Sequence, residues 1–200
     1  MGGSTLKRLL FRLRLTPKGR LRRNVVILLL IPLVLLLVHR PCFTHQAALE
    51  QLQKTYHFGP VDAAQWYPEE HTYALRYDRW YAACPLEQGY FFFVPTWEPG
   101  RWGLLAAPVE DAPLSVCGID NSDLLFGLCS DPAIEFIRLT YTDGEATHTA
   151  EAVPGEGGLF LYHCPEGLRE YDLYTAQALD GQGQVLYTVT RSTINENELI

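Results

Sequence analysis

The sequence predicts a mainly β protein with a single N-terminal transmembrane helix followed by antiparallel β-sheet units. An unbroken apolar run directly follows a strongly basic N-terminus, which is typical of a membrane segment. Short alternating or aromatic segments separated by turn signals fill most of the remaining sequence, as in small β-sandwiches. With 13 prolines, 16 glycines and 12% aromatic residues among 200, neither a disordered chain nor an all-helical one is expected.

Charge is distributed unevenly along the chain, whose net charge is −7. Nine of the 16 lysines and arginines lie in the first 40 residues, and the first acidic residue is Glu50. Residues 41–200 therefore carry 23 carboxylates against seven cations, a net charge of −16. This acidity argues against a nucleic-acid partner and implies solubility and some attraction for cations.

The apolar run covers residues 25–38 without a break. A helix of that length spans about 21 Å, which is less than the roughly 30 Å hydrocarbon core of a bilayer. We therefore expect the transmembrane helix to occupy residues 25–43, with Cys42 and Phe43 adding apolar length and Arg40 snorkelling to the interface.

The basic segment 1–24 sets the expected orientation, because it holds eight cations and no carboxylate. By the positive-inside rule this tail is cytoplasmic and the region after the helix is extracytoplasmic. The tail and residues 25–43 are then expected to contact membrane lipids. A cleaved signal peptide is the alternative, although residues 39–45, which follow the apolar run, contain no small-x-small cleavage pattern.

Residues 44–71 are expected to form a short helix and a turn-rich connector. Thr44 can cap the helix, and Ala48, Leu52 and Tyr56 fall on one helical face.

Residues 72–122 form an expected aromatic-rich β unit. Alternation over 73–77 predicts a half-exposed strand, whereas the aromatic run 89–94 predicts a strand buried on both faces. The Pro-Gly pair within 96–108 predicts a hairpin there, and residues 120–123 are the expected boundary with the next unit.

Residues 123–200 form the second expected unit, a β-sandwich. Asp143-Gly144 is a strong signal for a type I′ turn, and a two-residue loop there would pair Leu139 with His148. The further expected strands are 158–164, 171–179 and 185–190, the last two joined by a hairpin about 180–183.

Two stretches of this unit carry a resemblance: Gly127–Gly144 (GLCSDPAIEFIRLTYTDG) and Ala176–Tyr187 (AQALDGQGQVLY). They resemble small immunoglobulin-like domains that lie outside the membrane in anchored proteins and lipoproteins of Gram-positive bacteria. The resemblance covers about residues 124–190. It implies an immunoglobulin-like sandwich and an extracytoplasmic location, and it transfers no activity and no functional residue.

Four cysteines of the expected exterior region are candidates for disulfides, namely Cys84, Cys117, Cys129 and Cys164. Four cysteines allow three pairings, and buried thiols are the alternative. Their spacing lacks the close pairs of a zinc site. Cys42, at the membrane face, could form an intermolecular bridge.

Catalytic motifs are missing from the sequence, which contains no G-x-S-x-G, no H-E-x-x-H and no phosphate-binding glycine loop. His163 and Cys164 are adjacent in an expected strand, so they point to opposite faces and cannot activate each other. Glu69-Glu70 is interpreted as solvated charge, and Asp123 and Asp131 as turn caps rather than calcium ligands. We expect no catalytic residue, no metal site and no cofactor.

Aromatic and cationic side chains form a candidate binding patch in the first β unit. Its members are Trp66, Tyr67, Arg76, Arg79, Trp80, Tyr81, Trp97, Arg101 and Trp102. Such aromatics can stack on sugars or anchor a protein partner, and the alternative is that they fill the core.

The sequence thus favours a non-enzymatic, membrane-anchored, extracytoplasmic β protein that binds an envelope or protein partner. A regulatory or structural subunit acting through its transmembrane segment and basic tail is the second hypothesis. A hydrolase with unrecognised catalytic groups is the third.

Overall fold

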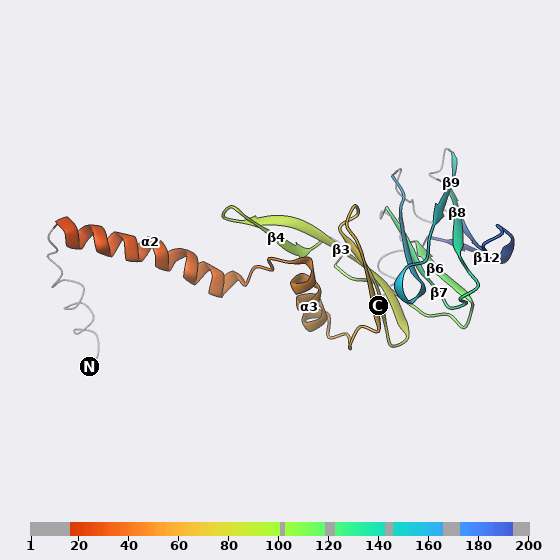
Figure 1. The fold of residues 1–200 in the computed structure, drawn as a ribbon, viewed down its shortest axis with the longest axis horizontal. Helices are drawn as coiled ribbons and strands as arrows, with labels where there is room; N and C mark the ends of the chain where they lie inside the picture. The colour runs from red at the N-terminus through yellow and green to blue at the C-terminus, as the bar shows by residue number, and fades with distance from the viewer. Residues whose placement is uncertain (1–16, 101–102, 119–122, 143–145, 166–172, 194–200) are drawn as a thin grey trace. The chain divides into compact units, whose positions relative to one another are not determined.

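A computed structural model describes residues 17–100, 103–118, 123–142, 146–165 and 173–193. The chain divides into two compact units, Met1–Pro41 and Cys42–Ile200 (Figure 1). The described part is mainly β, with antiparallel sheets and an apolar N-terminal helix, which confirms the expected fold class.

The first unit contains helix α2, Pro17–His39, in which no residue is buried. The described part of this helix starts at Pro17, so the basic segment 18–23 before the apolar run is helical as well. The helix ends before the expected residue 43. Pro41 disfavours α-helical geometry at Arg40, whose φ is +46°, and Cys42 forms an isolated β-bridge with Trp97 instead.

Helix α3, His45–Tyr56, opens the second unit as expected. The Thr44 hydroxyl accepts a hydrogen bond from the Ala47 N–H at 3.1 Å and caps the helix. Ala48 and Leu52 are fully buried against the first sheet, whereas Tyr56 is half exposed.

The first sheet has the strand order β1-β2-β3-β4, and β5 also pairs with β3. Its strands are β1 Ala63–Tyr67, β2 Thr72–Tyr77, β3 Trp80–Phe91, β4 Val94–Pro99 and β5 Leu105–Pro108. The expected hairpin over 96–108 is wrong. Strand β4 pairs with the second half of β3 and β5 with its first half, so the chain passes along one edge of β3. The actual hairpin joins β3 and β4.

Strand β2 corrects a second expectation, because it is buried on both faces and not half exposed. Tyr73, Leu75 and Tyr77 pack beneath α3, and Ala74 faces the opposite core. On the second face Thr72 and Ala74 are buried and Arg76 is exposed, so the alternation in the sequence resembles that of an amphipathic strand although most of both faces is covered.

Two further antiparallel sheets form a β-sandwich. One has the order β10-β7-β6, with β6 Leu114–Gly118, β7 Leu124–Cys129 and β10 Leu159–His163. The other has the order β12-β11-β8-β9, with β8 Phe136–Thr142, β9 Thr147–Ala152, β11 Leu173–Leu179 and β12 Val185–Ser192. A 3-10 turn, η1 Glu156–Gly158, precedes β10. Apolar side chains of both sheets share one buried cluster.

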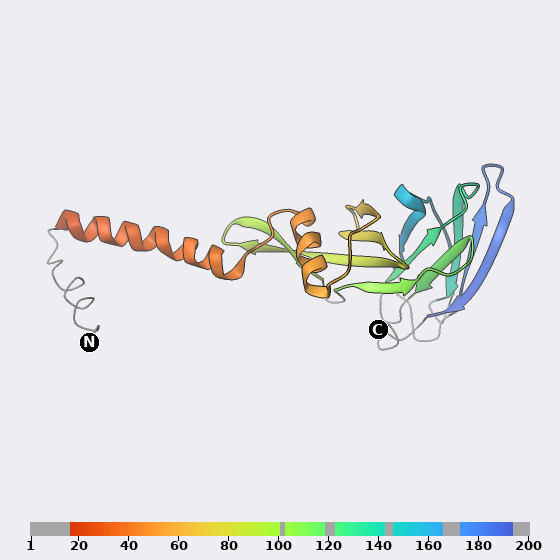
Figure 2. The ribbon, with the colours of Figure 1, turned by 90° about the horizontal axis from the view of Figure 1, so that it is seen from below.

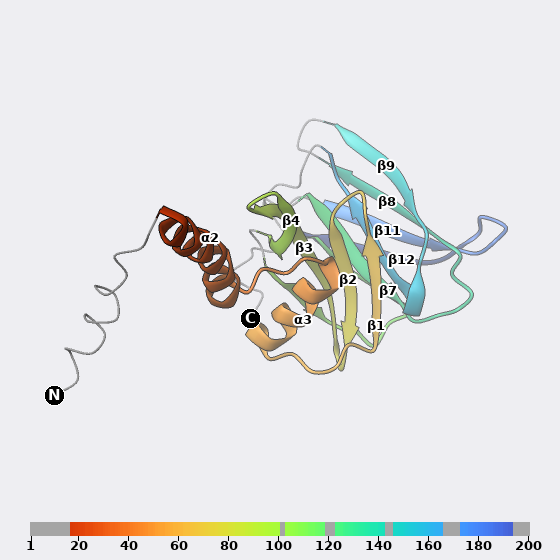
Figure 3. The same ribbon diagram turned by 60° about the vertical axis from the view of Figure 1, so that its left-hand side comes forward.

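The second unit is therefore a stack of four layers: α3, the first sheet, β10-β7-β6 and β12-β11-β8-β9 (Figures 2 and 3). A buried cluster separates each layer from the next, and β7 is buried along its whole length. The expected division at 120–123 does not separate two independent β units. Strands β6 and β7 pair on either side of it, and their sheet packs on both neighbouring layers.

The β8–β9 hairpin forms, but its expected register is wrong by two residues. Leu139 pairs with Ala150 and Tyr141 with His148, so the loop comprises residues 143–146. A shift of two preserves the side-chain faces, so the core is unaffected. The expected turn residues Asp143-Gly144 lie outside the described residues.

The final hairpin, β11–β12, turns about Asp180 as expected. The Asp180 carboxylate accepts hydrogen bonds from the backbone N–H groups of Gln182 at 2.9 Å and Gln184 at 2.8 Å.

Candidate functional site

The structure does not gather the candidate binding patch on one surface. Trp66, Trp80 and Trp97 are partly buried against the core beneath α3. Tyr67 and Tyr81 lie on the opposite face of the sheet, where Tyr81 is only 2% exposed. Most of the aromatic side chains therefore fill cores, which was the alternative interpretation.

The two described cationic members of the patch differ from its aromatic members in being exposed to solvent. Arg76 and Arg79 are exposed, and Arg76 lines a pocket together with Ser130 and Asp131. Arg101 and Trp102 lie outside the described residues.

Trp66 and Trp97 do meet, in a half-buried aromatic cluster with two histidines. The rings of His45 and Trp66 stack with centroids 4.5 Å apart, and His71 lies parallel to Trp66 at 6.5 Å. Trp97 meets Trp66 edge-on at 5.6 Å, and His45 Nδ1 lies 2.5 Å from the Tyr73 hydroxyl. These contacts join the start of α3 to β1, β2 and β4, so the cluster fixes the N-terminal end of the second unit.

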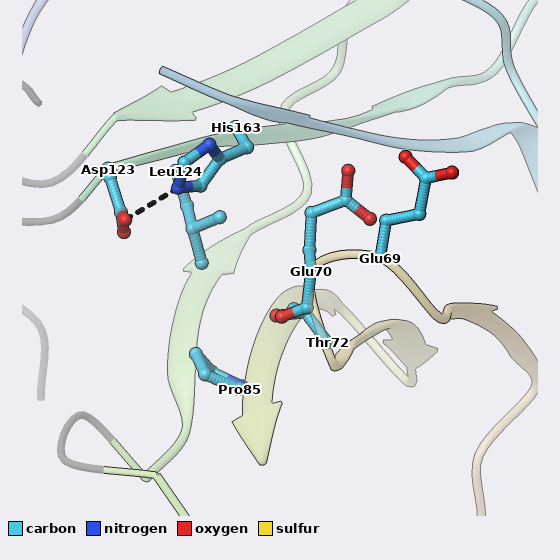
Figure 4. Close-up of a pocket in the computed structure, with 7 residues that line it drawn as sticks. All are labelled: Glu69, Glu70, Thr72, Pro85, Asp123, Leu124 and His163. Carbon is cyan, nitrogen blue, oxygen red and sulfur yellow. Dashed lines mark hydrogen bonds and ion pairs between the residues drawn. The ribbon is translucent and has the colours of Figure 1, made fainter. Parts of the chain in front are cut away.

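A polar cavity of about 380 Å³ lies where the first sheet meets β7 and β10 (Figure 4). His163 Nε2 lies 2.7 Å from Asp123 Oδ2, and Glu69 and Glu70 line the same cavity from the β1–β2 turn. The His163–Asp123 pair is about half exposed, and exposed ion pairs contribute little to stability.

The chemistry of this cavity is electrostatic. Thr72 supplies the one hydroxyl among its described lining residues, and that hydroxyl is buried and donates to the Glu70 carbonyl at 2.8 Å. Within the described part of the chain, no group of three or more His, Cys, Asp or Glu side chains could hold a metal ion. The cavity is therefore acidic, and its lining suits a cationic group.

Sequence reasoning missed the His163–Asp123 pair because 40 residues separate its members. Antiparallel pairing places Leu124 opposite His163, which brings Asp123 to the histidine. Asp131, in contrast, caps its turn as expected, since its carboxylate accepts from the Ala133 N–H at 2.9 Å.

All five cysteines are thiols in the structure, so the disulfides considered among Cys84, Cys117, Cys129 and Cys164 are not formed. Cys84 and Cys117 lie in two different cores, and the other two share a third. Those two lie at opposite ends of β7, about 20 Å apart along the strand direction, whereas a disulfide needs Cα atoms within about 7 Å. Burial raises the pKa of Cys84, Cys117 and Cys129 to about 12, which suppresses their reactivity.

Cys42 differs from the other cysteines because it is only partly buried. Its thiol donates to Gln51 Oε1 at 2.9 Å. It is therefore the most accessible cysteine of the chain, and it lies in the segment that follows α2.

Among the described residues, the most exposed aromatic side chains lie at the end of the β3–β4 hairpin, residues 90–94, which we call the aromatic tip. Phe93 is 95% exposed and Tyr90 71%, and Phe92 and Val94 are also exposed. The expected strand buried on both faces is thus wrong here, because Phe92, with φ +57°, turns the chain back on itself. Glu87 and Glu98 pair across the hairpin, and the segment between them, which includes the aromatic tip, carries no charged side chain.

Comparison with protein families gives a match to a domain of unknown function, DUF5044, over residues 41–154, more than half of the chain. The chain belongs to the DUF5044 family. The DUF5044 region begins just after α2 and includes α3 and strands β1 to β9, with the aromatic cluster and the aromatic tip. Neither a curated protein nor a solved structure matches this DUF5044 chain.

Proposed function

We propose that this protein is a single-pass, membrane-anchored β module that is held outside the cytoplasm and binds a partner there. Helix α2 carries the proposal. It is long and apolar enough to cross a membrane, none of its residues is buried in protein, and the DUF5044 region starts immediately after it. Its 23 residues span about 35 Å, of which the apolar run 25–38 accounts for about 21 Å, so its basic first turns would lie at the membrane interface.

The charge asymmetry supports an extracytoplasmic β unit. Lys18, Arg20, Arg22 and Arg23 lie in the first turns of α2, and no carboxylate precedes them. Residues 41–200 are strongly acidic, and the positive-inside rule retains the basic end in the cytoplasm.

The strand order supports an immunoglobulin-like sandwich of the kind found in many cell-surface domains. A three-stranded sheet faces a four-stranded one in which the last two strands of the chain neighbour β8 and β9. This order corresponds to the A-B-E and G-F-C-C′ sheets of immunoglobulin-related sandwiches.

Binding is favoured over catalysis by the chemistry of the described surface. The polar cavity contains an acid–base pair and two further carboxylates, with its one hydroxyl buried and engaged. The thiols of Cys84 and Cys117 lie in cores, and burial raises their pKa to about 12, so they are unsuited to nucleophilic attack. A subunit that acts through α2 and the basic tail is the second candidate, favoured by the density of cations before the apolar run.

Cys42 provides the test of this proposal. Intact cells that express the full chain are treated with a membrane-impermeant maleimide, the membranes are washed with alkaline carbonate, and the mass of the protein is measured in the membranes and in the released fractions. We expect a full-length mass and a label that the substitution Cys42→Ser removes. Loss of about 40 N-terminal residues would show a cleaved signal sequence, and labelling of Cys42 only after lysis would show the opposite orientation; either result overturns the proposal.

A further inference from the structure

The β3–β4 hairpin presents apolar side chains to solvent where a water-soluble surface would carry polar ones. It projects beyond the other strands of its sheet and ends in the aromatic tip (Figures 1 and 2). Phe92 and Phe93 occupy the turn, and neither lies in a buried cluster of the described structure. Contiguous exposed apolar side chains are typical of surfaces that contact another protein or a membrane.

The distribution of charge along the hairpin sets how far it can enter such a phase. Residues 88–97 contain no charged side chain, and Glu87 pairs with Glu98 at the base of this segment. Phe92 is five positions after Glu87, which corresponds to about 17 Å of strand. The tip can therefore enter the 5–10 Å deep boundary of headgroups and acyl chains while both carboxylates stay in water.

The hairpin is tethered to the end of α2 by a short, bonded connection. The Trp97 N–H donates to the Cys42 carbonyl at 2.7 Å, and only Arg40 and Pro41 separate Cys42 from the last residue of α2. The covalent path from His39 to Cys42 is at most about 11 Å. Phe93 is four residues from Trp97, about 13 Å along β4.

These distances place the membrane within reach of the tip whenever α2 spans it. Insertion is then an intramolecular event with a high effective concentration, so a small apolar surface suffices. Tyrosine favours the membrane interface, and phenylalanine is one of the apolar side chains that interfacial segments bury at the boundary of headgroups and acyl chains. Backbone groups of the tip are paired between Phe91 and Val94, which limits the polar surface taken out of water.

We infer that the aromatic tip, residues 90–94, is a second membrane contact that inserts into the interface of the bilayer spanned by α2. This contact would hold the β3–β4 hairpin at the membrane surface. The inference rests on the proposed function, since it requires α2 to remain in the membrane.

The test introduces one tryptophan at the tip of the full chain. Phe93→Trp is reconstituted into vesicles of phosphatidylcholine and phosphatidylglycerol, with and without bromine on the acyl chains, and its emission is compared with that of the parent chain. We expect bromine to quench the added emission about twofold and the bilayer to protect it from acrylamide. Val153→Trp, at a site 63% exposed after β9, is the matched control and should show neither effect.

Three outcomes separate the inference from the proposed function. A chain that does not float with the vesicles refutes both, because α2 then fails to insert. A chain that floats but leaves the Phe93→Trp emission as unquenched as that of Val153→Trp overturns the inference alone and would indicate a protein partner for the tip. Selective quenching at position 93 supports the inference.

Discussion

Replacing Gly127 by alanine is expected to destabilise the second unit strongly, because the position has no space for a methyl group. Gly127 lies in the middle of β7, paired with Val116 of β6 and Phe160 of β10. A Cβ there would lie 2.5 Å from ring carbons of Phe160 and closer still to the Ser115 carbonyl oxygen. Ordinary contacts at such a Cβ are 3.4–4 Å.

The size of the effect follows from the surroundings of these two neighbours. Ser115 and Phe160 are both fully buried, so neither can move aside without disturbing an adjacent core. Overpacking a well-packed core costs about 1–3 kcal/mol, and we expect the upper end, about 3 kcal/mol, because one neighbour is backbone. For a unit of this size that corresponds to a Tm lower by roughly 6–12 °C.

Thermal unfolding of the full chain in detergent micelles, followed by circular dichroism, measures this effect. Gly59→Ala is the matched control, since nothing lies within 4 Å of the added Cβ and its Tm should be unchanged. If Gly127→Ala unfolds at the temperature of the control, β7 is not the closely packed centre of its sheet and the four-layer arrangement is refuted.

Three further predictions concern the cores. Tyr174→Phe should lower the free energy of unfolding in urea by about 1–3 kcal/mol, because the buried Tyr174 hydroxyl forms hydrogen bonds with two backbone groups of β6. An unchanged urea midpoint would contradict that burial. Leu52→Ala should lower the free energy of unfolding by about 2–5 kcal/mol, since this fully buried side chain joins α3 to the sheet. The exposed Lys54→Ala should lower it little, and equal losses for the two variants would contradict the packing of α3 on the core. The thiols should leave the free energy of unfolding unchanged below pH 9 and lower it from there towards pH 12, because Cys84 and Cys117 ionise near pH 9 when unfolded but near pH 12 when folded. Replacing both by alanine should reduce that slope, and an unaltered slope would assign it to other groups.

Local signals predicted the presence of both described helices and the position of the last turn. The apolar run of α2, the Thr44 cap of α3 and the Asp180 turn each depend on residues that are close in sequence. Such features are stabilised by contacts within one or two turns of the chain, so the sequence is sufficient to specify them.

Burial was harder to predict, and β2 and the aromatic tip show why. Alternating Tyr73, Leu75 and Tyr77 indicated one exposed face, but α3 covers one side of β2 and the sheet β10-β7-β6 the other. The run of phenylalanines indicated a strand at the centre of a core, yet its backbone turns at Phe92 and leaves the side chains in solvent. The burial of a strand depends on what packs against it, and its own side chains do not specify that.

The sequence by itself determined that this protein is mainly β, that it carries one apolar N-terminal helix and that the region after the helix is acidic. Only the tertiary structure decided that the cysteines lie apart, that Asp123 meets His163 and that the aromatic tip is exposed. Composition and periodicity record local preferences, because they arise from the conformation of neighbouring residues. Strand pairing and layer order bring together residues that are tens of positions apart, and those contacts determine which side chains remain available to a partner.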